Sequence, residues 1–211
     1  ALPRPVLMRG SPVLEWVHDE TVVVSVMKRI LVIGPGGAGK STLAKRLGGI
    51  LVLPVVHLDA LYWKRGWVEP SKSDWAATVE AALARDAWVM DGNFSGTLER
   101  RLAACDAVVF LDLPRTTCVW RVLKRVLRYR NATRPDMAPD CPERFNMKFL
   151  LWIWNYRTAT RPKVVHLLDA CGANVRVIRL HSQSEVEQFL ARGFSVALWS
   201  NPSEHEHPGP R

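Results

Sequence analysis

The residues with the clearest chemistry lie in the stretch "GPGGAGKST", residues 34–42. This stretch fills the pattern G-x-x-x-x-G-K-[ST], in which glycines let backbone N–H groups curl around phosphate oxygens. In such a loop Lys40 reaches the β- and γ-phosphates, and the Ser41 hydroxyl is a ligand of Mg²⁺. An apolar run typical of a strand precedes the loop and a helical pattern follows it, so the helix N-terminus adds partial positive charge. The sequence therefore predicts that ATP and Mg²⁺ are bound by Gly34, Gly36, Gly37, Ala38, Gly39, Lys40, Ser41 and Thr42.

A phosphate-binding loop of this kind needs an acidic partner on a neighbouring strand, which holds the metal or its waters. Asp91 ends the run "AWVMD", and Gly92 then lets the chain turn at the edge where such sheets bind ligands. Asp112, in "AVVFLDLP", precedes a helix, where a solvated or capping carboxylate is the simpler account. We therefore predict that Asp91 is catalytic and that it positions the metal together with Ser41.

A basic helix face is predicted within "CVWRVLKRVLRYR", residues 118–130. Valines and leucines occupy one face, and the opposite face carries Arg121, Lys124, Arg125 and Arg128. Most such faces are merely solvated, but this one leads into a proline-rich segment, which we interpret as a lid over about residues 131–147. Planar guanidinium groups grip phosphate oxygens and stabilise the charge of a transferring phosphoryl group. The predicted lid adds Arg130, Arg134 and Arg144 to the basic residues of the helix that could take this role.

The chain resembles the adenylate-kinase-like P-loop kinases, and most closely the bacterial adenylate-kinase-like group labelled DNA topology modulation proteins. The resemblance is carried by "GPGGAGKST", "LPVVHLDALYWKRGW", "WVMDGNFSGTL", "FLDLPRTTCVWRVLKR" and "TRPDMAPDCPERF". It covers residues 27 to about 192, and it implies a five-stranded parallel sheet with a lid after the fourth strand. It also implies that Arg121 and Arg125 form one lid-arginine pair and Arg134 and Arg144 a second.

Two departures from that family concern the phosphoryl acceptor. Adenylate kinases follow D-G with F-P-R, whose arginine holds the acceptor phosphate, whereas this chain continues with Asn93, Phe94 and Ser95. A second arginine, expected after the second strand, is replaced around Tyr62. AMP is therefore not assumed to be the acceptor.

Asp59, in "HLDALYW" after the second predicted strand, indicates a different acceptor. A carboxylate there resembles the acceptor-hydroxyl site of shikimate- and gluconate-type kinases. A hydroxyl nucleophile benefits from a base, whereas an anionic phosphate acceptor does not. The alternative is that Asp59 caps the next element or orders a magnesium-bound water.

The elements that must position these residues alternate between short apolar runs and helical patterns. The predicted strands are 29–33, 55–58, 88–90, 108–111 and 175–178. This alternation predicts an α/β fold, a P-loop NTPase with a five-stranded parallel sheet flanked by helices and an inserted lid. We expect a buried helix in the apolar run "NMKFLLWIWNYR" after the lid. The folded domain is expected over residues 27–200, with an extension at 1–26 and a disordered tail at 201–211.

The composition limits the class of protein. Lys and Arg total 29 against 20 Asp and Glu, a formal net charge of +9 that favours anionic partners. The four cysteines form no C-x-x-C pair, so neither a zinc site nor a disulfide framework is indicated. No apolar run reaches the roughly 18 to 20 residues that span a bilayer, and a cytoplasmic location is expected.

These patterns favour an ATP-dependent kinase of the nucleoside monophosphate kinase type, with a small acceptor that the family resemblance makes a nucleotide. A kinase acting on a small-molecule hydroxyl group is the alternative that Asp59 supports. A nucleic-acid-binding P-loop NTPase involved in DNA topology is a third reading, although the sequence holds no helix-turn-helix, zinc-finger or RNA-binding signature. A protein that binds nucleotide without turnover is a further possibility.

Overall fold

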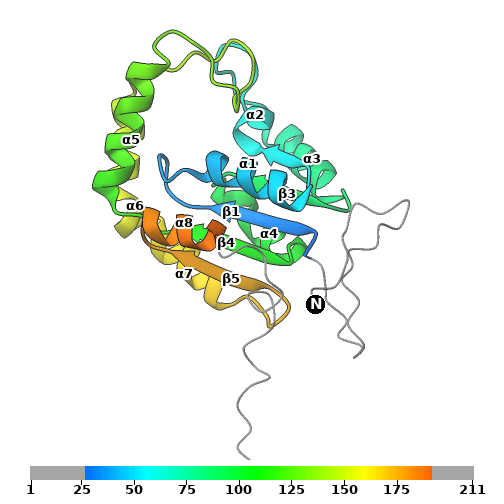
Figure 1. Cartoon of the computed structure of the whole chain (residues 1–211). Helices are drawn as coiled ribbons and strands as arrows, with labels where there is room; N and C mark the ends of the chain where they lie inside the picture. Colours follow the sequence, from blue (N-terminus) through cyan, green and yellow to red (C-terminus); the bar gives the residue numbers. More distant parts are fainter. Residues whose placement is uncertain (1–26, 192–211) are drawn as a thin grey trace, which may run out of the picture.

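The structure is a computed structural model in which residues 27–191 are described. Figure 1 shows a central sheet between two sets of helices, with a long connection running across one end of the sheet. The expectations for residues 1–26, 192–200 and 201–211 lie outside the described residues.

Five parallel strands form the sheet in the order β2-β3-β1-β4-β5. They are β1 (Arg29–Ile33), β2 (Val55–His57), β3 (Trp88–Asp91), β4 (Ala107–Leu111) and β5 (Arg176–Leu180). The predicted fold class is therefore confirmed, and all five strands were placed within two residues of their observed bounds. The second strand ends one residue earlier than predicted, because Leu58 already begins a helix.

The sheet is buried on both faces because its strands alternate apolar side chains between two cores. On β1, Ile30 and Val32 face one core, whereas Leu31 and Ile33 face the other. All four are at most 1% exposed, as expected for the central strand of a parallel sheet that helices cover on both faces.

The helices follow the strands in alternation. They are α1 (Lys40–Leu51), α2 (Leu58–Tyr62), α3 (Lys72–Leu83), α4 (Leu98–Ala104), α5 (Arg115–Arg128), α6 (Met147–Ala159), α7 (Arg161–Asp169) and α8 (Gln183–Ala191), with a short 3₁₀ turn at Ser95–Thr97. Helices α1, α5 and α8 pack on one face of the sheet, and α3, α4 and α7 pack on the other. No helix among the described residues is long and apolar enough to cross a membrane.

The helix α6 differs from the prediction of a buried helix. Ile153 and Tyr156 are buried, but Leu151 and Trp154 are 53% and 43% exposed. The reason is that α6 packs on α5 and α7 at the rim of the sheet, so only part of its apolar circumference is covered.

The connection between α5 and α6, residues 129–146, is the segment predicted as a lid, and we call it the lid segment. In Figure 1 it crosses from the end of α5 to the region of α2 and returns to α6. Its tip contacts the turn after α2: the Gly66 amide donates to the Asp140 carbonyl at 3.0 Å, and Trp67 Nε1 donates to the Pro142 carbonyl at 3.1 Å. The lid segment thus connects the end of α5 with the turn after α2.

Candidate active site

The loop between β1 and α1 has the geometry of a phosphate-binding loop. Gly37 and Gly39 adopt φ values of +80° and +97°, which are open to glycine and strained for other residues. A Cβ on Gly37 would also lie 2.3 Å from the Cys118 carbonyl oxygen, because α5 packs directly against the loop. The two glycines therefore allow a tight backbone curl that other residues would not adopt at this position.

The N-terminus of α1 is open to an anion. Gly39 caps the helix without a side-chain hydrogen bond, so the first amide groups have no side-chain acceptor. Lys40 follows directly and donates through Nζ to the Pro35 carbonyl at 3.1 Å. Loss of water contact lowers the pKa of the Lys40 ammonium below 10.5, while Asp59 and Asp91 oppose that shift. The arrangement concentrates positive potential where a nucleotide phosphate fits.

A cavity of about 1110 Å³ opens over this loop. Helix α8 and the basic face of α5 line one side of it, and α2, the turn after α2 and the loop after β3 line the other. The predicted residues that line it are Gly36, Gly37, Ala38, Gly39, Lys40, Ser41, Thr42, Asp59, Arg121, Arg125, Arg134 and Arg144. Gly34 and Asp91, the remaining two predicted site residues, do not line the cavity.

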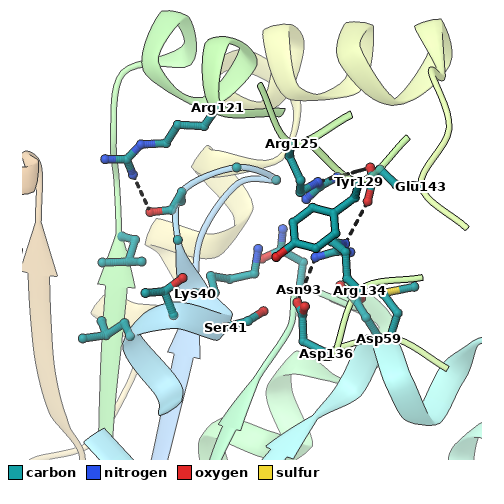
Figure 2. A pocket seen from close by; sticks show the side chains of 18 of the residues that line it. Lys40, Ser41, Asp59, Asn93, Arg121, Arg125, Tyr129, Arg134, Asp136 and Glu143 are labelled. Carbon is teal, nitrogen blue, oxygen red and sulfur yellow. Dashed lines mark hydrogen bonds and ion pairs between the residues drawn. The ribbon is translucent and has the colours of Figure 1, made fainter. Parts of the chain in front are cut away.

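Two of the lid arginines are paired with a carboxylate from the lid segment itself. Arg125 donates to Glu143 at 2.9 Å, and Arg134 forms an ion pair with the same carboxylate at 2.8 Å. The Arg134 contact is made by its buried Nε atom, which lies 2.8 Å from Glu143 Oε2. Figure 2 shows both guanidinium groups turned toward Glu143.

The other two lid arginines have different surroundings. Arg121 donates to the Ala38 carbonyl of the phosphate-binding loop at 3.2 Å and to the Gln183 side chain at 2.8 Å. Arg144 is exposed, and its guanidinium carbon lies 5.4 Å from the centre of the Trp67 ring. The structure thus places all four predicted arginines around one cavity, and Arg121 and Arg144 are the two that form no ion pair among the described residues.

Asp136 of the lid segment lies beside Ser41 (Figure 2). Burial alone would raise the pKa of this carboxyl, but the Arg134 guanidinium at 2.8 Å and a hydrogen bond with the Ser41 hydroxyl keep it below 3.8. The carboxylate is therefore ionised at neutral pH, next to the hydroxyl that the motif assigns to a metal.

Oxygen donors suited to Mg²⁺ are thus present, but the described residues hold no group of three or more potential His, Cys, Asp or Glu metal ligands. Magnesium in nucleotide sites keeps several waters and uses substrate phosphates together with one or two protein oxygens. Ser41 and Asp136 are the two donors that the cavity offers side by side.

Asp59 in the first turn of α2 reaches the same cavity from the side opposite α8. Loss of water contact raises the pKa of its carboxyl above 3.8, against the pull of the Lys40 ammonium. A carboxyl group with a raised pKa close to the phosphate-binding lysine is suited to general base chemistry. Asp59 does not cap α2, because the N-cap residue is His57 and no side-chain hydrogen bond caps this helix.

Asp91 is 3% exposed and lies beneath the cavity wall. His57, at the end of β2, is the partner of this carboxylate, with Nδ1 at 2.8 Å. A metal role for Asp91 stays a prediction, because its carboxylate does not line the cavity. The Asp112 carboxylate is not solvated and caps no helix. Arg161 donates to it at 2.6 Å, so the two residues form a structural ion pair.

The loop after β3 contributes residues that the sequence did not single out as a site. The Gly34 amide donates to the Asn93 side-chain oxygen at 3.2 Å, which ties this loop to the phosphate-binding loop. Arg101 is fully buried and donates to the carbonyl groups of Gly92 and Phe94 at 2.9 Å, and also to that of Asn93. The guanidinium group thereby fixes the backbone that presents Asn93 and Phe94 to the cavity.

Sequence reasoning also missed the two lid carboxylates and the residues of α8. The alternation of acidic and basic residues within "TRPDMAPDCPERF" was a signal for internal pairing. Gln183, Val186, Glu187 and Leu190 line the cavity from α8, but their i, i+3 and i+4 spacing is equally typical of any helix packed on a sheet.

No protein-family model matches the chain. Among solved structures, shikimate kinase from Bacteroides thetaiotaomicron has 17% identity and a TM-score of 0.47, covering 79% of this chain and 96% of that one. Shikimate kinase from Acinetobacter baumannii in complex with shikimate has 15% identity and a TM-score of 0.48, covering 79% and 92%. At these values the likeness carries no argument, and the P-loop NTPase fold rests on the strand order and the phosphate-binding loop of this chain.

Proposed function

We propose that this protein is an ATP-dependent kinase that transfers the γ-phosphate to a hydroxyl group of a small molecule. The observation that carries the proposal is Asp59, a carboxyl group with a raised pKa in the cavity that Lys40 and the phosphate-binding loop share. A base beside the transferred phosphate is of use to a hydroxyl acceptor, because a hydroxyl group must lose its proton.

In this proposal each cavity residue has one task. The amides of the phosphate-binding loop and Lys40 hold the donor phosphates, and the lid arginines stabilise the charge that spreads over the transferred group. Asp59 orients the acceptor hydroxyl and accepts its proton. Ser41, with Asp136 as its neighbour, would hold a magnesium ion, which would supply positive charge to offset the charge of the donor phosphates. The lid segment excludes water from the reaction.

A nucleoside monophosphate kinase is the second candidate, and the family resemblance favours it. The exposed Arg144, which lines the cavity outside any ion pair among the described residues, is a group that an anionic acceptor would use. Against it stands Arg101, which is committed to three backbone carbonyl groups and holds no acceptor phosphate in this arrangement.

The test is ATP consumption with Mg²⁺ against nucleoside monophosphates, nucleosides and hydroxylated metabolites, for the wild type and for Asp59→Asn and Lys40→Ala. We expect turnover with a hydroxyl acceptor, a loss of about 10²- to 10³-fold in kcat for Lys40→Ala with the fold intact, and loss of transfer in Asp59→Asn. Turnover with a monophosphate that Asp59→Asn leaves unchanged would favour the second candidate. Full activity in Lys40→Ala would contradict the site assignment, and ATP binding without any transfer would leave a nucleotide-binding protein.

A further inference from the structure

The side of the cavity that holds Asp59 is walled by aromatic rings. Trp63, Trp67 and Phe94 line it from the end of α2, the following turn and the loop after β3. The rings form one cluster: Trp63 and Trp67 meet edge to face with centroids 5.2 Å apart, and Tyr62 joins Trp63 to Phe94 with centroid separations of 5.0 and 4.8 Å. Interlocked rings form a rigid wall with little side-chain entropy left to lose when a ligand packs on it.

Two of these rings are carried on strained backbone. Trp67 has φ +66° and Phe94 has φ +29°, values that bulky side chains rarely adopt. Strain of this kind persists only where the surrounding structure imposes it, and it gathers at ligand sites. At Phe94 the constraint is the Arg101 guanidinium, which binds the Phe94 carbonyl at 2.9 Å. At Trp67 it is the indole hydrogen bond to Pro142 of the lid segment.

Two of the arginines on this side of the cavity are already bound to protein groups. Arg134 is paired with Asp136 and Glu143, and the buried Arg101 is bound to backbone carbonyl groups. Arg144, which lies over the Trp67 ring, is in no ion pair among the described residues. For a ligand packed on Trp63 and Phe94 instead, the polar groups that remain are the Asp59 carboxyl and the Asn93 amide, whose oxygen already accepts from Gly34. A carboxyl group and an amide form hydrogen bonds with hydroxyl groups. The ionised Asp59 carboxylate also repels an anionic ligand.

We propose that the acceptor is an uncharged ring compound that bears a hydroxyl group, with a flat ring face packed on Trp63 and Phe94. This inference rests on the proposed function. The hydroxyl oxygen forms a bond to the γ-phosphorus, and the bond from that phosphorus to the β,γ-bridging oxygen breaks. The hydroxyl proton passes to the Asp59 carboxylate, and the products are ADP and a phosphate monoester of the ring compound.

The experiment compares paired acceptors with the same ring, one neutral and one anionic, at saturating Mg²⁺ and ATP. The pairs are a nucleoside with its 5′-monophosphate, a methyl pyranoside with the corresponding uronate, and shikimate methyl ester with shikimate, beside a linear polyol without a ring. We expect a neutral ring member to have a kcat/KM at least about tenfold above both its anionic partner and the linear polyol. A preference for the anionic members or for the linear polyol would overturn the inference and leave the kinase proposal standing. Absence of transfer to every member would overturn the kinase proposal itself.

Variants of the wall provide the second readout. Trp63→Leu is expected to raise KM for the neutral acceptor about five- to tenfold, the loss expected for one aromatic contact, with the KM for ATP unchanged. The matched control is Trp154→Leu, which removes an exposed indole of α6 outside the cavity lining. Equal effects of the two substitutions on acceptor KM would contradict the aromatic wall. A KM for the anionic partners that rises in Arg144→Ala, with no change for neutral acceptors, would show that only anions reach that arginine.

Discussion

Asp59 is the residue whose proton should set the pH dependence of the reaction. Its pKa lies above 3.8 because its surroundings withhold water, so the base form appears later on the pH scale than for a free aspartate. We expect the acidic limb of the kcat/KM profile to lie above pH 3.8 and to disappear in Asp59→Asn, with a loss of about 10²- to 10⁴-fold in rate. Steady-state kinetics between pH 4 and 8 measure this limb.

The stability of the same variant separates a catalytic role from a structural one. Because the folded state binds the Asp59 proton more readily than the unfolded state, ionisation of Asp59 lowers stability as pH rises through the window above 3.8. Asp59→Asn removes that cost, so its melting temperature at pH 7 should equal or exceed that of the wild type. A clear fall in melting temperature would instead indicate a structural carboxylate.

Arg101 is a positioning residue, and its effect should be larger on the acceptor than on ATP. Burial lowers the pKa of its guanidinium to about 10, so it is still cationic at neutral pH. Arg101→Lys keeps the charge but cannot reach three carbonyl groups with one ammonium, and we expect a loss of about 2–4 kcal/mol in unfolding free energy. The KM for the acceptor should rise more than the KM for ATP.

The adjacent Arg100 offers a matched control for that substitution. Arg100 is paired with Glu80 on the surface, with 63% and 54% of the two side chains exposed. Arg100→Lys should cost less than about 1 kcal/mol. Urea unfolding of both variants decides the comparison, and equal losses would refute the role assigned to Arg101.

At the scale of elements, local patterns predicted most of what is observed. The strands and the phosphate-binding loop are specified by runs of adjacent residues, so the fold class and the place of Lys40 and Ser41 could be read from the sequence. The partial exposure of α6 could not be predicted from the sequence. Its apolar run would be the same whether other helices pack on one of its faces or on all of them. Pairings between distant residues, such as His57 with Asp91, depend on strand order and carry no local signal.

In the lid segment, Glu143 forms ion pairs with two of the lid arginines. Glu143 is 7% exposed and neutralises both Arg125 and Arg134, so its carboxylate competes with nucleotide phosphates for the same donors. We expect Glu143→Gln to lower the melting temperature of the free protein, because the partly buried Arg125 loses its counter-charge and Arg134 keeps only Asp136. ATP should raise the melting temperature of this variant by more than it raises that of the wild type.

The control is Glu187→Gln, which alters an exposed ion pair with Arg46 on the side of the cavity formed by α8. Thermal denaturation with and without ATP, at low and moderate salt, gives the comparison. An ATP shift in Glu143→Gln no greater than in Glu187→Gln would mean that Glu143 does not compete with phosphate.

At the scale of the whole molecule, part of the net positive charge lies on side chains that line the cavity. Arg121 and Arg125, from the basic face that the sequence predicted on α5, line the cavity and contact the phosphate-binding loop and the lid segment. Part of the basic composition therefore lies in the cavity, so the net charge by itself is a weak argument for nucleic-acid binding.

The lid segment closes the cavity by docking on the turn after α2, and the buried Cys141 lies at that contact. Its thiol lies 3.4 Å from the Lys64 carbonyl oxygen, and Cys141 packs with Met137 and Ala138 against Trp63 and Trp67. Entry of a ligand past this contact would require the lid segment to open, and that opening should expose the thiol. Cys105 is buried between α4 and the sheet, where exposure requires a larger opening.

We therefore expect a thiol reagent to label Cys141 faster than Cys105, with the two sites resolved by mass spectrometry. ATP with Mg²⁺ should slow the labelling of Cys141 severalfold, because ligands that bridge the loop and the lid arginines favour the closed state. Asp140→Asn removes the charge that pairs with Arg65 at the docking contact and should speed that labelling, with little change in overall stability because the pair is exposed. If Cys141 and Cys105 react at the same rate with and without ATP, the lid segment opens only when the whole domain unfolds. That outcome would contradict the proposal that ligands enter past the lid.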